Sequence, residues 1–162
     1  MGAHDAHMKP PKGGYDSLSP EQRTKIKDVY LYHLELNHSG KIFHKVGITG
    51  DPRSRFAGIQ RQSQSTIVNG WTFMYRNAEV AFQKEQKLLA FLQFGQRWCK
   101  KTRGFIEYNN RRSYEPYIHP IKFCGSNELF IPVPNPKGWN LDLNNIPERS
   151  PRFNYNEDPI AA

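Results

Sequence analysis

The sequence predicts a small α+β domain, with a central, mainly antiparallel three-stranded sheet flanked by helices. Two runs rich in Val, Ile, Tyr and Phe, residues 29–36 and 41–49, enclose the turn-forming segment 37–40, which is typical of a β-hairpin. A third run of aromatic residues at 71–75 predicts another strand. Apolar residues then recur at three- and four-residue spacing over 78–94, which indicates a helix. We also expect a basic loop insertion and an extended C-terminal tail.

The length of 162 residues favours one domain with flanking tails. We expect an N-terminal tail or arm over residues 1–27, in which Ser19 caps a short helix that begins at Pro20. The domain itself is predicted to cover 28–133. Prolines and asparagines dominate 134–162, and this segment is predicted to be an extended tail.

Composition and charge limit the classes of function. The formal net charge of +8 and the isoelectric point near 9.6 favour a polyanionic partner, most simply nucleic acid, although a merely basic protein would also show them. The two cysteines lack metal-ligand spacing, so we expect reduced thiols in a cytoplasmic protein. No apolar run approaches membrane-spanning length, so a membrane partner is not expected.

The hairpin is expected to separate its residues into two faces. If Leu36 pairs with Lys41, then Tyr32 lies opposite Lys45 and Tyr30 opposite Gly47. The other face would carry aliphatic residues, namely Val29, Leu31, Val46 and Ile48, with His44 among them. The aliphatic face should be buried, whereas the face with two phenols, an ammonium group and a glycine suggests a functional site.

A helix is predicted over 52–62, with Asp51 as its N-cap. Arg55 shares the inward stripe of this helix with Phe56 and Ile59. A desolvated guanidinium needs an anionic partner or ligand. We therefore expect Arg55 either to bind an anion or to pair with a carboxylate of the protein.

The helix predicted over 78–94 carries Glu85 as the only charge on its apolar stripe. A carboxylate among aliphatic neighbours must be protonated, paired or bound to a metal, because burying an unpaired charge costs several kcal/mol. Glu85 is thus a candidate metal ligand, and an ion pair between Glu85 and Arg55 is the structural alternative.

Residues 96–117 interleave cations with aromatic side chains, as expected for a loop that contacts a nucleic-acid backbone. The residues predicted to bind nucleic acid are Arg53 and Arg61 of the helix over 52–62 and Arg97, Lys100, Lys101, Arg103, Arg111 and Arg112 of this insertion. A short strand over 128–131 is expected to return to the sheet.

The order of hairpin, Arg-bearing helix, strand and Glu-bearing helix resembles the GIY-YIG nuclease superfamily. Asp28-Val29-Tyr30 stands where that family has G-I-Y or G-V-Y, and Lys45-Val46-Gly47 stands where it has Y-I-G. Arg55 follows Gly47 by eight residues, which matches the family's spacing, and Glu85 occupies the position of its metal-binding Glu. Glu128-Leu129-Phe130 resembles the E-W-F of a divergent, phage-rich branch that has K-x-G as its second motif.

The chain also departs from the family pattern. Lys45 replaces the second motif tyrosine, and Ile59 stands where many members have His or Tyr. The late Asn of the family has only Asn127 and Asn109 as candidates. These departures leave the general base unidentified.

The resemblance implies an endonuclease that hydrolyses DNA phosphodiester bonds with one Mg²⁺ or Mn²⁺ held by Glu85. Arg55 would hold the phosphate, and Tyr30, tuned by Lys45 and assisted by Tyr32, would orient or activate water. A phage protein acting in the host cytoplasm would fit this reading. The alternatives are a GIY-YIG-like module that binds nucleic acid without cleaving it, and a basic interaction protein in which Arg55 and Glu85 pair.

Overall fold

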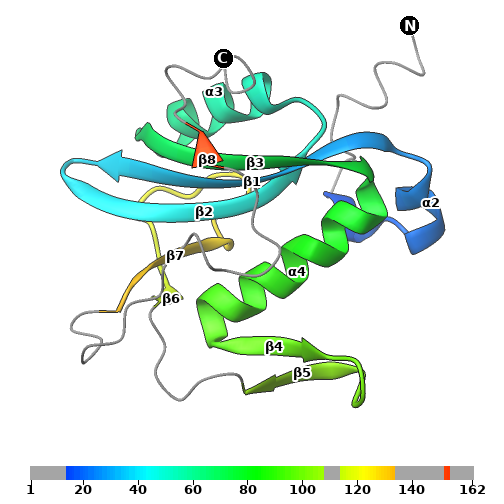
Figure 1. Ribbon diagram of the computed structural model, residues 1–162. Helices are drawn as coiled ribbons and strands as arrows, with labels where there is room; N and C mark the ends of the chain where they lie inside the picture. The colour runs from blue at the N-terminus through cyan, green and yellow to red at the C-terminus, as the bar shows by residue number, and fades with distance from the viewer. Residues whose placement is uncertain (1–13, 108–113, 134–151, 154–162) are drawn as a thin grey trace, which may run out of the picture.

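A computed structural model describes residues 14–107, 114–133 and 152–153 of the chain (Figure 1). Its elements follow in the order η1 (Tyr15–Ser17), α2 (Pro20–Thr24), β1 (Lys27–His38), β2 (Lys41–Thr49), α3 (Pro52–Ser63), β3 (Thr66–Asn77), α4 (Ala78–Phe94), β4 (Gln96–Cys99), β5 (Gly104–Glu107), β6 (Tyr114–Pro116), β7 (Leu129–Pro132) and β8 (Arg152–Phe153). The predicted α+β class with a mainly antiparallel sheet flanked by helices is confirmed.

The main sheet is larger than predicted. Its strands lie in the order β6-β7-β2-β1-β3-β8, and every pairing in it is antiparallel. The short strand expected over 128–131 is confirmed as β7, which pairs with two residues of β2. The count of three strands is wrong, because β6 and β8 join the sheet as well. Strands this short carry little periodicity, so the sequence pattern does not reveal their pairing. The outermost strand, β8, has two residues, and the rest of the predicted tail lies outside the described residues.

The helices lie on opposite faces of this sheet. Figure 1 shows α3 above the sheet and α4 below it, with the β4–β5 hairpin beyond α4 on the side away from the sheet. This hairpin forms a separate two-stranded sheet within the segment that the sequence predicts as a basic loop. A two-stranded hairpin is marginal by itself, so its position against α4 matters for its stability.

The register of the β1–β2 hairpin differs by two residues from the predicted one. His38 pairs with Lys41, so the turn is the two-residue Ser39-Gly40 rather than a four-residue loop. Both turn residues have positive φ, 52° and 87°, which is the conformation of the tight type I′ turn that matches strand twist. Tyr32 therefore lies opposite Gly47 and not opposite Lys45. Because the shift is even, every side chain stays on its predicted face.

The strand after α3 begins earlier than the sequence suggests. The chain reverses at Gln64, which caps α3 in the left-handed conformation with φ 53°, and β3 starts at Thr66. Asn-Gly is a common turn signal, but here Asn69 and Gly70 both pair with β1 inside the sheet. A register shift between Glu35 and Leu36 absorbs the irregularity there.

Helix boundaries agree closely with the sequence analysis. The predicted helix over 78–94 is confirmed as α4, and the predicted helix after Asp51 is confirmed as α3. The Asp51 side chain accepts a hydrogen bond from the Ser54 amide at 3.3 Å, as expected for an N-cap. The short helix predicted after Ser19 is also confirmed, as α2.

Two apolar layers hold these elements together. On the α3 face, the buried cluster consists of Tyr32, Leu34, Leu36, Phe43, Phe56, Ile59, Ile67 and Leu129. On the α4 face, the cluster consists of Leu31, Val46, Leu88, Leu92, Tyr114 and Phe130. The N-terminal segment adds to the α4 side, where Tyr15 packs near Ala78 and Ala81 and Arg23 pairs with Glu79 at 2.6 Å. In the described ranges, no helix is long and apolar enough to cross a membrane.

A pair of histidines is buried on the α4 face. His33 Nε2 and His44 Nδ1 lie 3.0 Å apart, so one imidazole donates to the other, which requires an unprotonated acceptor nitrogen. The ring of His44 also stacks on Phe130, with centroids 5.1 Å apart. Burial lowers the pKa of His44 to about 4 from its ordinary value of 6.5.

We expect the free energy of unfolding to fall as the pH is lowered from about 6.5 to about 4, because the unfolded chain binds the His44 proton first in that window. The loss assigned to this residue is roughly 3 kcal/mol at most. Urea unfolding of the parent and of His44→Leu across this range measures it. The variant should show a shallower pH dependence, whereas His38→Gln, at the exposed end of the hairpin, should keep the parental slope. Equal slopes for the parent and His44→Leu would contradict the assignment.

Candidate active site

Lys45 is a fully buried cation in the middle of β2, on the face that packs against α3. Its Nζ donates to the Gly125 carbonyl at 3.0 Å and to Glu128 Oε1 at 3.4 Å. Both acceptors come from the segment that leads into β7. A buried ammonium group is tolerated only with such partners, so Lys45 fixes this segment against the edge of β2.

Arg55 points inward from the first turn and a half of α3 and is half-buried, as the sequence analysis predicts. Its Nε donates to the Tyr32 hydroxyl at 3.3 Å, and its Nη2 donates to the Cys124 carbonyl at 2.9 Å. Burial lowers the pKa of Arg55, but the neighbouring Tyr32, Cys124 and Glu128 outweigh burial and raise this pKa above its ordinary value. The guanidinium therefore stays charged beside Lys45.

Gly125 brings the two cations to one point. Its φ is +88°, and a Cβ there would lie 2.7 Å from Lys45 Nζ and 2.8 Å from Arg55 Nη2. The carbonyls of two successive residues, Cys124 and Gly125, thus accept hydrogen bonds from two separate cations. Side chains from α3 and β2 converge on one short stretch of backbone.

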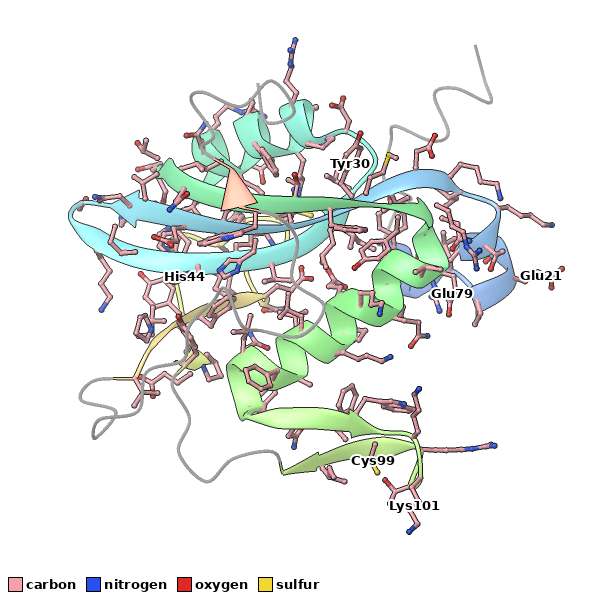
Figure 2. The ribbon with its side chains drawn as sticks, in the orientation of Figure 1. Glu21, Tyr30, His44, Glu79, Cys99 and Lys101 are labelled. Atoms are coloured by element: carbon pink, nitrogen blue, oxygen red, sulfur yellow. The ribbon has the colours of Figure 1, made fainter. Side chains whose placement is uncertain are left out.

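Tyr32 is the phenol that belongs to this cluster. Its hydroxyl accepts from Arg55, and its ring lies over Gly47, the residue opposite it in the sheet. Tyr30 lies on the same face two residues earlier, opposite Thr49, and is half-buried (Figure 2). Among the described residues, no hydrogen bond or ion pair joins Tyr30 to the cluster. The structure therefore brings together Tyr32, Lys45 and Arg55 and leaves Tyr30 beside them.

Glu85 reaches the same region from the opposite face of the sheet. It is 5% exposed on α4, and its Oε1 accepts from Gln86 Nε2 at 3.0 Å. Its carboxyl group also lies within hydrogen-bonding reach of Glu128. Burial raises the pKa of Glu85 and the charge of Glu128 raises it further, whereas Lys45 lowers it, and the pKa stands well above its ordinary value. The protonated form of Glu85 is therefore favoured in the metal-free protein.

Glu128 connects the two faces of the sheet because it stands immediately before β7, beyond the residues that pair with β2. Its Oε1 contacts Lys45 from the α3 side, and its carboxyl group meets Glu85 from the α4 side. The backbone of Glu128 is fixed as well, since its carbonyl accepts from the Val46 amide at 3.3 Å. The triplet that begins at Glu128 carries part of the family resemblance, but the sequence pattern indicates no role for this residue.

The ion pair between Arg55 and Glu85, expected as the structural alternative, is not formed. Lys45 pairs with Glu128 instead, and among the described residues no ion pair joins Arg55 to Glu85. Arg55 and Glu85 extend from helices on opposite faces and meet the cluster from different sides. The buried carboxyl group of Glu85 accepts from the Gln86 side chain instead.

The donor set suits a hard divalent cation. Glu85 and Glu128 offer carboxylate oxygens at one place, which is the chemistry that Mg²⁺ prefers, and Mg²⁺ is commonly held by one or two carboxylates together with substrate phosphate. The described residues include no group of three or more His, Cys, Asp and Glu side chains that could hold a metal. Any metal here would thus take its remaining ligands from water and substrate.

The predicted nucleic-acid contacts lie in two places. Arg53 and Arg61 are exposed on the outer face of α3, as expected. Lys100, Lys101 and Arg103 are exposed at the turn between β4 and β5 (Figure 2 labels Lys101). Arg111, Arg112 and the side chain of Arg97 lie outside the described part of the chain. Of the late-Asn candidates, Asn127 is exposed beside Glu128, and Asn109 also lies outside that part.

Comparison of the chain with protein-family models, with curated proteins and with solved structures finds no match. The interpretation of the site depends on its own geometry.

We expect Gly47→Ala to destabilise the protein by about 1–3 kcal/mol, the usual cost of overpacking a core. The added Cβ would lie 2.6 Å from Tyr32 Cζ and closer still to the hydroxyl oxygen, so the buried ring would have to move. Gly58→Ala is the matched control, because its Cβ meets nothing within 4 Å on α3 and should stabilise the helix by roughly 0.5–1 kcal/mol. Chemical denaturation measures both; similar effects would show that Tyr32 is not held over Gly47.

Glu85→Gln should stabilise the metal-free protein at neutral and alkaline pH. A carboxyl group whose pKa is raised on folding loses its contribution to stability as the pH rises through that folded value, and the uncharged amide does not titrate. The difference in melting temperature between variant and parent should therefore grow from pH 5 to pH 8. Glu21→Gln, at an exposed site on α2, should show no such trend. A Glu85→Gln protein that is less stable than the parent at every pH would contradict the raised pKa.

Proposed function

We propose that the protein is a divalent-metal-dependent endonuclease that hydrolyses phosphodiester bonds in DNA. One observation carries the proposal: Tyr32, Lys45, Arg55, Glu85 and Glu128 come from five separate segments and meet at the edge of the sheet beside the start of β7. Two cations with a hydroxyl, next to a carboxyl pair, form the set of groups that phosphoryl transfer uses. The resemblance in motif order and spacing supports the same reaction.

Glu85 and Glu128 would hold the metal ion. When bound, Mg²⁺ or Mn²⁺ would polarise the scissile phosphate and stabilise the leaving oxygen. Glu85 would hold the ion in its deprotonated form, because metal ligands must be deprotonated. The raised pKa of Glu85 implies that binding weakens as the pH falls.

Arg55 and Lys45 would bind the phosphate. Both now donate to backbone carbonyls, which are neutral acceptors, and a phosphate oxygen is a stronger acceptor for the same donors. Arg55 is half-buried and therefore accessible, whereas Lys45 lies behind it and supplies charge at close range. These groups would offset the charge that develops on the phosphate.

The group that orients water is assigned to Tyr32 in preference to Tyr30. Tyr32 has its hydroxyl on the Arg55 guanidinium and its ring 5.9 Å from Lys45 Nζ. The hydroxyl is thereby held next to the two cations that would bind the phosphate. Tyr30 remains the residue indicated by the motif resemblance, and its half-buried position on the same face allows it to contact substrate.

A second candidate is a nucleic-acid-binding module without cleavage. The observation that favours it is that Lys45 and Arg55 both already contact the loop from Cys124 to Glu128. A module of this kind needs the positive charge but not the carboxyl pair. The two candidates differ in their dependence on metal.

Incubation of supercoiled plasmid with the protein and Mg²⁺ or Mn²⁺ tests the proposal. We expect nicking that chelation abolishes, and we expect Glu85→Gln and Arg55→Ala each to reduce the rate by about 100-fold or more. Lys41→Ala removes an exposed charge from the β1–β2 turn and should leave the rate unchanged.

Retardation of DNA on a gel without nicking, and without need for metal, would support the binding module instead. A folded Glu85→Gln protein that nicks at the parental rate would show that the assignment of the site is wrong.

A further inference from the structure

The β4–β5 hairpin presents an aromatic pair next to a group of cations. Trp98 and Phe105 are direct cross-strand neighbours, and their rings meet edge to face with centroids 5.3 Å apart. They are 37% and 41% exposed, although side chains of this size are usually covered. An edge-to-face pair leaves both faces of one ring uncovered by the other. This aromatic pair is therefore available for a planar ligand.

The turn of the same hairpin is strongly basic. Lys100, Lys101 and Arg103 are all exposed within the four residues that join the strands. The turn is well defined, since the Arg103 amide donates to the Cys99 carbonyl at 2.9 Å and Arg103 has φ 55°. Three like charges held this close repel one another and favour a polyanion.

We propose that the hairpin binds single-stranded DNA, with the aromatic pair stacking on an unpaired base and the basic turn contacting the adjacent phosphates. Stacking on aromatic side chains beside a positively charged track is the common way of binding a single strand. This inference extends the proposed function by naming the kind of DNA that the nuclease holds.

Duplex DNA fits the hairpin less well. A two-stranded ribbon can enter the major groove, but there it reads base edges through hydrogen-bonding side chains. The exposed cross-strand pair here is Trp98 with Phe105, and Phe105 has no polar group. The faces of these rings can be used only by a base that has left the stack.

The place of the hairpin agrees with a substrate-holding role. It lies beyond α4, on the side away from the sheet (Figure 1). Glu85 of the same helix interacts instead with Glu128 and Lys45. The strand that is held and the bond that is cut would thus occupy different parts of the molecule. Removal of the hairpin contacts should weaken binding without altering the cluster.

Fluorescence anisotropy with a labelled oligothymidylate of about 20 nucleotides tests the inference, in the presence of a chelator so that cleavage does not interfere. Trp98→Ala should weaken binding by about 5- to 150-fold, and Trp98→Phe should retain most of the affinity. Lys100→Ala should reduce the slope of log affinity against log salt by about 0.7. The duplex of the same sequence should bind more weakly and should respond little to Trp98→Ala.

Phe73→Ala is the matched control, because Phe73 is a 43% exposed ring of β3 that packs on Tyr75 with centroids 4.8 Å apart. Circular dichroism and thermal unfolding establish that each variant folds, and Trp98→Phe preserves the test if the alanine variant does not. The inference would be overturned if both Trp98 variants bound with parental affinity, or if Trp98→Ala lost no more affinity than Phe73→Ala. It would also be overturned if the parent preferred duplex or did not bind the oligonucleotide. Hairpin-dependent binding without nicking would leave it standing and reject only the nuclease.

Discussion

The buried ammonium group of Lys45 is the constraint on which the arrangement of the site depends. A charge in the middle of β2, with no exposed surface, must find acceptors within reach of its own side chain. The protein supplies them from the lead-in to β7, which is distant in sequence, and so fixes that segment at the sheet edge. Once the segment is fixed, its Cys124 carbonyl accepts a hydrogen bond from Arg55, and its Glu128 carboxyl group interacts with Glu85. Replacing this cation by an apolar residue would remove the reason for the loop to lie there.

The even alternation of side chains made much of the site predictable. Tyr32, Lys45 and Gly47 lie on one face in the predicted register and in the observed one, because a shift of two residues changes partners but not faces. Glu85 was predictable for a similar reason, since α4 is long and strongly periodic, and one charge on an apolar stripe stands out. Arg55 was found by the same rule on a shorter helix.

What could not be predicted depends on contacts between segments far apart in sequence. Nothing in the pattern around Glu128 shows that it contacts both Lys45 and Glu85. These contacts depend on the pairing of β7 with β2, which covers only two residues and leaves no periodic signal in the sequence. The turn at Ser39–Gly40 was misjudged, since a serine with positive φ is uncommon and four polar residues resemble a longer loop. The β4–β5 hairpin was not predicted, because the many cations in this segment are typical of a loop.

Among the described residues, the late start of β7 leaves one end of β2 without a strand partner on that side. Only His44 and Lys45 of β2 pair with it, and in the described part of the chain no strand covers that edge beyond Val46. Two more residues of pairing at this end would place a paired strand beside Gly47, where side chains from both faces of the sheet meet. The length of β7 therefore decides which backbone lies beside Gly47, independently of any reactive group. An insertion or deletion directly before Leu129 would change the spacing between β7 and the groups that hold Lys45, so the length of this lead-in is fixed by the cluster itself.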